Sequence, residues 1–277
     1  IPSLLLRIDD EKSGDYQEYL NGRYDAVREF VGKLPKSAQK IIVGKKAEVL
    51  LSEFDPGAED KILTGIVYQQ MHCGWRDATA IVKKLSDKKK KELFAGYFGG
   101  RKARWYKVGR ALENSYVRFD ITMDIGAYRD LHRHRMMTQE RQLFTTHHGY
   151  AVPAELREAD LAKKYIVALD KAKVLFEKLE KHDPYLAQYA VPLAYRVRFY
   201  QWQNFRQAFW ETELRTISQG HPDYRYIEQE KYRLMKEKFP LIAEYMLVDM
   251  NDYKIARRGT EEKITKKEKD LIEKLRK

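Results

Sequence analysis

The 277-residue sequence has a single cysteine, Cys73, and so cannot close a disulfide bond within the chain. The lone thiol also excludes a zinc site built from several cysteines, and it makes a cytoplasmic location the simplest interpretation. The 15 glycines and 8 prolines are too few for a collagen-like or low-complexity chain. Every apolar run is shorter than the roughly 18–20 residues that a membrane-spanning helix needs, so we do not expect a transmembrane protein.

Hydrophobic residues make up 43% and charged residues 34% of the chain, as is typical of a folded globular protein. The 53 basic residues exceed the 41 acidic ones, which gives a formal charge of +12. A positive protein attracts anions, and charge alone leaves nucleic acid, nucleotides and phosphorylated cofactors open as partners. The chain starts at Ile1 rather than Met and has no signal-peptide pattern, which favours a processed chain or a fragment.

The spacing of apolar residues predicts several helices and two strands. We expect helices at residues 15–34, 59–70, 76–85, 154–181, 204–218 and 223–238, and a helical stretch that runs into residues 132–135. Apolar and polar residues alternate at 115–123 and again at 193–202, which is the pattern of half-buried strands. The fold class is therefore α+β, helix-rich with a small, mostly antiparallel sheet.

Three segments are expected along the chain. Residues 1–45 form an N-terminal helical segment, 46–250 the main domain, and 251–277 a basic helical tail. From residue 254 onward, ten basic residues stand against five acidic ones.

The first stretch rich in reactive side chains is His132-Arg133-His134-Arg135. Arginine forks onto phosphate oxygens, and two arginines spaced by two residues can clamp a diphosphate. A solvated basic helix face is the simpler alternative. A metal site that also uses His147 and His148 is disfavoured, because the interleaved arginines repel a cation, and we expect no metal.

The second stretch contains Asn204, Arg206 and Arg215. Arg215 lies nine residues after Arg206, so the two occupy different faces of one helix, and one could hold a cofactor while the other holds a substrate. The alternative is that both arginines are solvated or salt-bridged, and that the neighbouring aromatic residues belong to the core.

These residues resemble the signature of the flavin-dependent thymidylate synthases. The family carries Arg-His-Arg, a Ser or Thr three residues later, and then a Glu; here Arg133-His134-Arg135 and Thr138 stand in register, and Glu140 falls one residue early. The family also has a His 19 residues before the first signature Arg, where this chain has Asn114 at the same spacing.

The downstream half of the resemblance is an Asn-x-Arg followed by Leu-Arg. Asn204-Phe205-Arg206 and Leu214-Arg215 match it at the family interval, after Val191-Pro192 in place of Leu-Pro. The resemblance covers about residues 61–250. Longer members of the family that look like tandem copies carry a similar Arg-His-Arg-Met-x-Thr-Gln-Glu-Arg-Gln motif. The sequence begins without Met, as we expect of the downstream half of such a chain.

The resemblance implies reductive methylation of dUMP to dTMP, with FAD as cofactor and NADPH and methylenetetrahydrofolate as co-substrates. It also implies a homo-oligomer, typically a homotetramer. The implied FAD-binding residues are Arg133, His134, Arg135, Glu140, Asn204 and Arg206. The implied substrate-binding residues are Arg133, Gln139, Glu140 and Arg215, of which Arg215 is catalytic because it favours loss of the uracil N3 proton.

Two substrate-binding arginines of the family are missing. A Ser-x-Arg-Tyr would fall near residues 142–145, which read Gln-Leu-Phe-Thr, and Gln188 stands at the other position. Arg141, Arg196 or Arg198 could substitute. The loss leaves open a non-catalytic paralogue that binds FAD or a nucleotide. A basic nucleic-acid-binding protein would rest on the +12 charge, the loop at 101–104 and the basic tail, and it is disfavoured because no zinc-finger, RNP or helix-turn-helix signature supports it.

Overall fold

The structure is a computed structural model that describes residues 11–35, 47–253 and 260–275. Contacts within the chain divide it into two units, Ile1–Ile42 and Val43–Lys277. The domain boundaries that we placed at 45/46 and 250/251 stay predictions.

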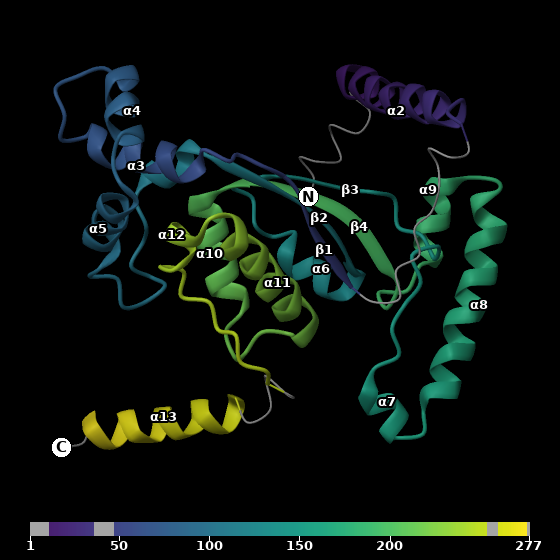
Figure 1. The fold of residues 1–277 in the computed structure, drawn as a ribbon. Coiled ribbons are helices and arrows are strands. Elements are labelled where there is room, and N and C mark those ends of the chain that lie inside the picture. The colour runs from purple at the N-terminus through teal and green to yellow at the C-terminus, as the bar shows by residue number, and fades with distance from the viewer. Residues whose placement is uncertain (1–10, 36–46, 254–259, 276–277) are drawn as a thin grey trace. The chain divides into compact units, whose positions relative to one another are not determined.

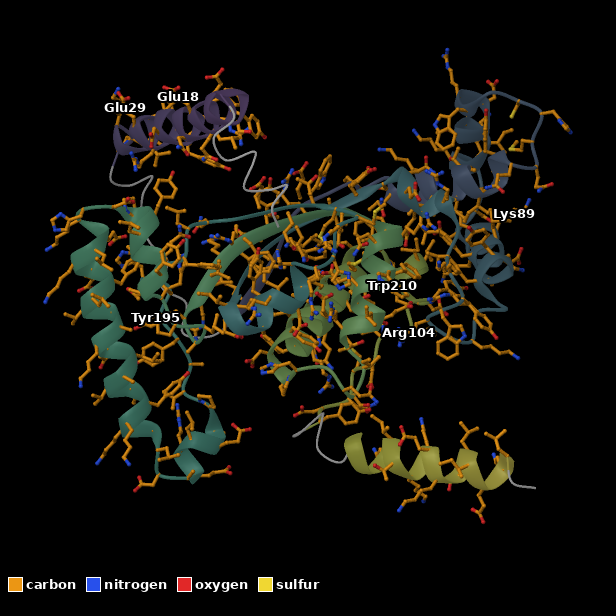
Figure 2. The ribbon with its side chains drawn as sticks, turned by 180° about the vertical axis from the view of Figure 1, so that it is seen from behind. Glu18, Glu29, Lys89, Arg104, Tyr195 and Trp210 are labelled. Atoms are coloured by element: carbon orange, nitrogen blue, oxygen red, sulfur yellow. The ribbon has the colours of Figure 1, made fainter. Side chains whose placement is uncertain are left out.

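The first unit contains helix α2 (Glu11–Gly32), close to the helix expected at 15–34. Its aromatic side chains are exposed, among them Tyr16, Tyr19 and Phe30. Glu18 and Glu29 extend from the same helix (Figure 2).

In the described part of the second unit, the strands form one antiparallel sheet in the order β1-β2-β4-β3 (Figure 1). The strands are β1 (Glu48–Phe54), β2 (Tyr116–Asp124), β3 (Thr138–Arg141) and β4 (Arg196–Asn204). The α+β class with a small antiparallel sheet is confirmed.

The two central strands, β2 and β4, carry the core. Val117, Phe119 and Ile121 on β2 face the same side as Val197 and Phe199 on β4, and all five side chains are buried. Each such side chain contributes about 1.5–3 kcal/mol by leaving water. Helices α6 (Ile125–Leu131), α10 (Phe205–Arg215) and α11 (Pro222–Lys238) pack against this face (Figure 1).

Each central strand runs directly into a helix. Asp124 ends β2 and caps α6, because its Oδ1 accepts a hydrogen bond from the Ala127 N–H at 2.7 Å. Asn204 ends β4 and caps α10 in the same way, with its Oδ1 2.9 Å from the Gln207 nitrogen. Helices α6 and α10 are thus fixed to paired strands.

The second unit has further helices besides those of residues 154–180. They are α3 (Ala58–Tyr68), α4 (Trp75–Lys83), α5 (Asp87–Phe98), η2 (Arg110–Asn114), α9 (Pro184–Ala187), η3 (Gln188–Ala190), α12 (Pro240–Ala243) and α13 (Thr260–Leu275). Among the described residues, no helix has both the length and the apolar character that crossing a membrane requires.

The single long helix expected at 154–181 is wrong. The segment forms two helices, α7 (Ala154–Glu158) and α8 (Ala162–Glu180), separated by a turn. Asp160 in that turn has φ 55°, a left-handed conformation that ends a right-handed helix. Apolar spacing continues across the break, and for this reason the sequence pattern does not reveal it.

The helix expected to reach residues 132–135 ends earlier. Helix α6 stops at Leu131 and His132 caps it, so the Arg-His-Arg motif lies in the turn that follows. Strands β1 and β3 were not predicted. β3 has four residues, fewer than an alternation pattern needs to be recognised.

Candidate functional site

The Arg133-His134-Arg135 motif lies in the turn between α6 and β3. The backbone N–H of His134 donates to the Leu131 carbonyl at 3.0 Å, which turns the chain back toward the sheet. This turn buries the His134 side chain and leaves Arg133 and Arg135 exposed. Arg133 forms an ion pair with Asp130 on α6.

His134 contacts Arg215, which lies 81 residues later in the last turn of α10. The Arg215 Nε donates to the His134 Nε2 at 2.8 Å, and Nη2 donates to the Asp130 carbonyl at 2.7 Å. The Asp130 carboxylate lies 3.8 Å from Nη1. The structure therefore joins the two stretches that the sequence singled out, with Asp130 as a partner shared by Arg133 and Arg215.

This contact determines the protonation state of His134. A guanidinium can only donate, so the His134 Nε2 must be an acceptor and the ring must be neutral, with its proton on Nδ1. The Gln207 Nε2 lies 3.2 Å from Nδ1, and because both atoms would donate in this tautomer, the Gln207 amide must be turned so that its oxygen accepts the Nδ1 proton. Burial lowers the pKa of His134, which agrees with a neutral imidazole.

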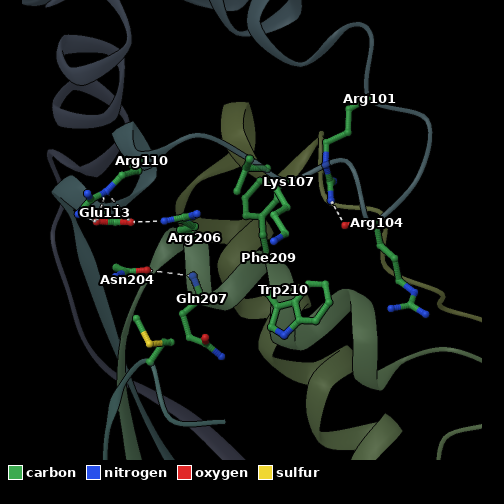
Figure 3. Close-up of a pocket in the computed structure, with 12 residues that line it drawn as sticks. Arg101, Arg104, Lys107, Arg110, Glu113, Asn204, Arg206, Gln207, Phe209 and Trp210 are labelled. Atoms are coloured by element: carbon green, nitrogen blue, oxygen red, sulfur yellow. Dashed lines mark hydrogen bonds and ion pairs between the residues drawn. The ribbon is translucent and has the colours of Figure 1, made fainter. Parts of the chain in front are cut away.

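A cavity of about 580 Å³ opens on the other side of α10 (Figure 3). Asn204 and Arg206 line it together with Met136, which follows the motif directly. Its basic lining residues are Arg101, Arg104, Lys107, Arg110 and Arg206. Arg206 and Arg215 thus point to different sides of α10, as their nine-residue spacing predicted.

Part of the positive charge in this cavity is neutralised. Glu113 lies between Arg110, at 3.1 Å, and Arg206, at 2.5 Å (Figure 3). The hydrogen bond from Arg110 is the largest cause that lowers the pKa of Glu113, so this carboxylate stays ionised. Arg101 is bound to the buried Glu213 through two hydrogen bonds, at 2.7 and 2.5 Å.

Arg104 and Lys107 have no acidic partner among the residues that the structure describes. Figure 3 shows the Lys107 side chain directed toward Phe209 and Trp210, and Figure 2 shows Arg104 and Trp210 on the same side of the molecule. Trp210 is 40% exposed, although it belongs to a helix that otherwise packs on the core. Unpaired cations beside exposed apolar rings fit a ligand that combines phosphates with aromatic rings, as FAD does.

Sequence reasoning noticed the basic loop at 101–104 but assigned it to nucleic acid, and it missed Lys107 and Trp210. Because Trp210 is apolar, a position in the core was the simpler interpretation of this residue. Only the fold brings that loop to the start of α10.

The two substrate-binding candidates on strand β3, Gln139 and Glu140, face opposite sides of the sheet. Gln139 faces the core side, where its Oε1 accepts from the Gln201 Nε2 at 2.8 Å. Glu140 is the next residue, so it faces the other side of the sheet and is exposed. The structure does not bring Glu140 to the His134–Arg215 contact.

Of the three possible substitutes for the missing arginines, Arg141 lies nearest to the vacated position. Its Nη1 donates to the Gln188 Oε1 at 3.2 Å, and its side chain is exposed. Arg198 forms an ion pair with Asp120 at 2.5 Å, and Arg196 is buried. Arg141 is therefore the arginine of the three that remains available to a ligand beside Gln188.

The histidine pair that follows β3 makes contacts within the protein. The His147 Nε2 lies 3.0 Å from a Glu180 oxygen, and the His148 Nε2 lies 3.3 Å from Gln142. Across the residues that the structure describes, no three His, Cys, Asp or Glu side chains gather in a way that could hold a metal ion.

Comparison with known proteins identifies the family. Residues 55–241 match the family described as thymidylate synthase complementing protein. The chain belongs to this family, the flavin-dependent thymidylate synthases, and the resemblance noted in the sequence is confirmed.

Three relatives give the same assignment. The chain is 36% identical over 202 residues to a UPF0159 protein of Chlamydia pneumoniae. It is 34% identical over 204 residues to a UPF0159 protein of Chlamydia muridarum, and 32% identical over 209 residues to one of Thermoplasma acidophilum. These matches cover 71, 73 and 74% of this chain but 38, 39 and 39% of the relatives, so the chain spans about two fifths of their length.

Proposed function

We propose that this chain binds FAD and catalyses the reductive methylation of dUMP to dTMP, with NADPH and methylenetetrahydrofolate as co-substrates. The observation that supports this proposal best is the contact between His134 and Arg215. It joins two segments of the family signature on one side of α10, while the other side lines a basic cavity.

FAD would be held in this cavity. Arg206 and Asn204 stand at the start of α10, where backbone N–H groups favour an anion, and Arg104 and Lys107 add two cations without acidic partners among the described residues. Each charge-assisted hydrogen bond to a phosphate contributes about 1.5–3 kcal/mol. The bound flavin supplies the hydride that the reaction needs.

Arg215 would stabilise negative charge that develops on the pyrimidine. His134 and Asp130 fix its guanidinium, and the Tyr224 ring lies 5.5 Å from it. The Arg215 side chain is 15% exposed, so little water screens the charge. A cation held in place before the reaction does not need to reorganise when charge appears on the substrate.

Arg141 would bind the nucleotide phosphate in place of the missing family arginines. It is exposed, and its guanidinium lies beside Gln188. This arginine is the feature that favours an active enzyme over a non-catalytic paralogue.

The non-catalytic paralogue remains the second candidate, because Gln188 cannot supply the charge of the arginine that the family carries at this position. The nucleic-acid alternative depends on the loop at 101–104, where Arg101 is committed to Glu213. We also propose the homotetramer that the resemblance implies, which light scattering after size-exclusion chromatography tests.

The function is tested by separating cofactor binding from substrate-dependent chemistry. FAD binding is measured by quenching of flavin fluorescence. Chemistry is measured by dUMP-dependent oxidation of the reduced flavin in a stopped-flow instrument, with methylenetetrahydrofolate present and oxygen excluded. We expect Arg206→Ala to weaken FAD binding. We expect Arg141→Gln to raise the dUMP concentration needed for half-maximal rate and to leave FAD affinity unchanged.

Arg215→Lys is the control for charge at the catalytic position, and it should retain more activity than Arg215→Ala. A wild-type protein that binds FAD but shows no dUMP-dependent oxidation would establish the paralogue. A protein that takes up no FAD at all would end the proposal.

A further inference from the structure

A group of polar side chains lies fully buried beneath the sheet. Lys231 on α11, Glu211 on α10, Glu228 on α11 and Gln201 on β4 all have 0% exposure. The Lys231 Nζ donates to Glu211 at 2.7 Å, to Gln201 at 2.9 Å and to Glu228 at 3.1 Å. The mechanism above uses none of these four residues.

Lys231 determines the direction of the hydrogen bonds around it. An ammonium group has three N–H bonds and no acceptor, so the Gln201 atom that it contacts must be the amide oxygen. The Gln201 nitrogen must then donate, and it lies 3.0 Å from a Glu211 oxygen and 2.8 Å from the Gln139 Oε1. Both N–H bonds of Gln201 are used.

The same direction continues to the open edge of the sheet. Because the Gln139 oxygen accepts from Gln201, its nitrogen is left to donate, and Gln139 lies close enough to the Tyr128 hydroxyl to act on the pKa of that phenol as a hydrogen-bond donor, which lowers it. Tyr128 then has its own O–H free to donate. Burial raises the pKa of Tyr128, so the phenol keeps that proton.

The charge balance of the buried group supports this order. Burial, followed by the neighbouring Glu211, raises the pKa of Glu228 to about 8. At neutral pH Glu228 is therefore protonated, and Lys231 and Glu211 form one neutral pair. Glu211 then stays a carboxylate, which accepts from Gln201 and cannot reverse the order.

We propose that Lys231 is a positioning residue for the substrate side of the site. Through Gln201 it fixes the orientation of the Gln139 amide. Gln139 on β3 and Tyr128 on α6 then offer hydrogen-bond donors to a ring that carries carbonyl oxygens. The matching ligand is a pyrimidine dione, which occurs both in uracil and in the flavin ring. The inference rests on the proposed function for the identity of the ligand. The order of the hydrogen bonds does not depend on it.

The test replaces Gln201 in the hydrogen-bonded chain from Lys231 through Gln201 to Gln139, which we call the relay. It compares the affinities of the protein for two nucleotides. Uracil has a carbonyl oxygen where cytosine has an amino group, so ordered donors favour dUMP over dCMP. We expect Gln201→Met to reduce the ratio of dUMP to dCMP affinity by about tenfold, the effect of one misdirected hydrogen bond. Dissociation constants are measured by isothermal titration calorimetry with FAD present.

Gln203→Met is the matched control. Gln203 lies on the same strand and the same face as Gln201 and is equally buried, and no described residue hydrogen-bonds its side chain. It should leave the nucleotide ratio unchanged. If both variants lower the ratio equally, or if Gln201→Met leaves it unchanged together with FAD affinity, the proposal is wrong.

A loss of FAD affinity with an unchanged nucleotide ratio would support the relay and assign its donors to the flavin ring. If Gln201→Met does not fold, Gln139→Met at the edge strand makes the same comparison, and an unchanged ratio and FAD affinity there would overturn the proposal.

A measurement without ligand separates failure of the relay from failure of the proposed function. Side-chain amide protons of ¹⁵N-labelled glutamine are followed by NMR, and the Gln201 pair is identified by its loss in Gln201→Met. Both protons should exchange with water at least about 100-fold more slowly than those of free glutamine. Rapid exchange would overturn the relay, whereas slow exchange in a protein that binds neither nucleotide would support the relay and refute only dUMP as the substrate.

Discussion

Replacing Lys231 by methionine tests how the buried group of Lys231, Glu211, Gln201 and Glu228 affects the free energy of unfolding. The substitution keeps the length of the side chain and its apolar contacts, including the position over the Phe119 ring at 5.3 Å. It removes the ammonium that donates to Glu211, Gln201 and Glu228. The Glu211 carboxylate is then left in the core without a counter-charge.

The expected cost is about 3–5 kcal/mol, as for removal of one partner from a buried ion pair. This is a large share of the roughly 5–15 kcal/mol that stabilise a typical domain. A second change, Glu211→Gln, removes the stranded charge. The double variant Lys231→Met/Glu211→Gln should therefore be more stable than Lys231→Met alone, by about 1–2 kcal/mol or more.

The assay is equilibrium unfolding in urea, followed by circular dichroism, with the free energy of unfolding extrapolated to water. Lys236→Met is the control, because Lys236 is an exposed residue of the same helix, and it should change stability by less than about 0.5 kcal/mol. The reasoning is refuted if Lys231→Met is as mild as Lys236→Met, or if Glu211→Gln does not restore stability to Lys231→Met.

Three further predictions concern other regions. Arg104→Ala and Lys107→Ala should each weaken FAD binding about tenfold, as measured by fluorescence titration. Lys102 lies on the same loop but does not line the cavity, so the control Lys102→Ala should leave FAD affinity unchanged. Glu228 holds a proton in the folded state up to about pH 8 but releases it near its ordinary pKa of 4.5 when unfolded, so stability should fall as pH rises between these values. Glu228→Gln should remove this contribution, which urea midpoints of the wild type and the variant at several pH values would show; a wild-type midpoint that does not fall relative to that of the variant as pH rises contradicts the sign. Asp160→Gly should raise stability by about 1 kcal/mol because it relieves the left-handed φ of 55°, and a lower melting temperature would contradict this.

The central strands were predictable because a local pattern determines them. Alternation of Val117, Phe119 and Ile121 with polar residues is sufficient to define a strand with one buried face. Caps are local as well: Ser86 accepts a hydrogen bond from the Lys89 N–H at 3.4 Å at the start of α5, and serine is a common residue at this position of a helix.

Contacts between distant segments were not predictable from local pattern. His134 and Arg215 look like ordinary solvated residues in their own segments, and only the family resemblance paired them. Lys231 and Glu211 are charged residues at buried positions, which a search for apolar spacing discards. Their partners come from different elements, so no spacing rule along the chain links them.

Because β2 continues into α6 and β4 into α10 without a loop, strand register sets the alignment of the His134–Arg215 contact. A two-residue slip between these strands would keep every apolar side chain on its proper face. It would nevertheless displace one helix along the other by about 6–7 Å, more than twice a hydrogen-bond length. A misregistered protein could therefore bury a full core and yet lose its chemistry, so folding yield alone is a poor measure of competence for variants in these strands.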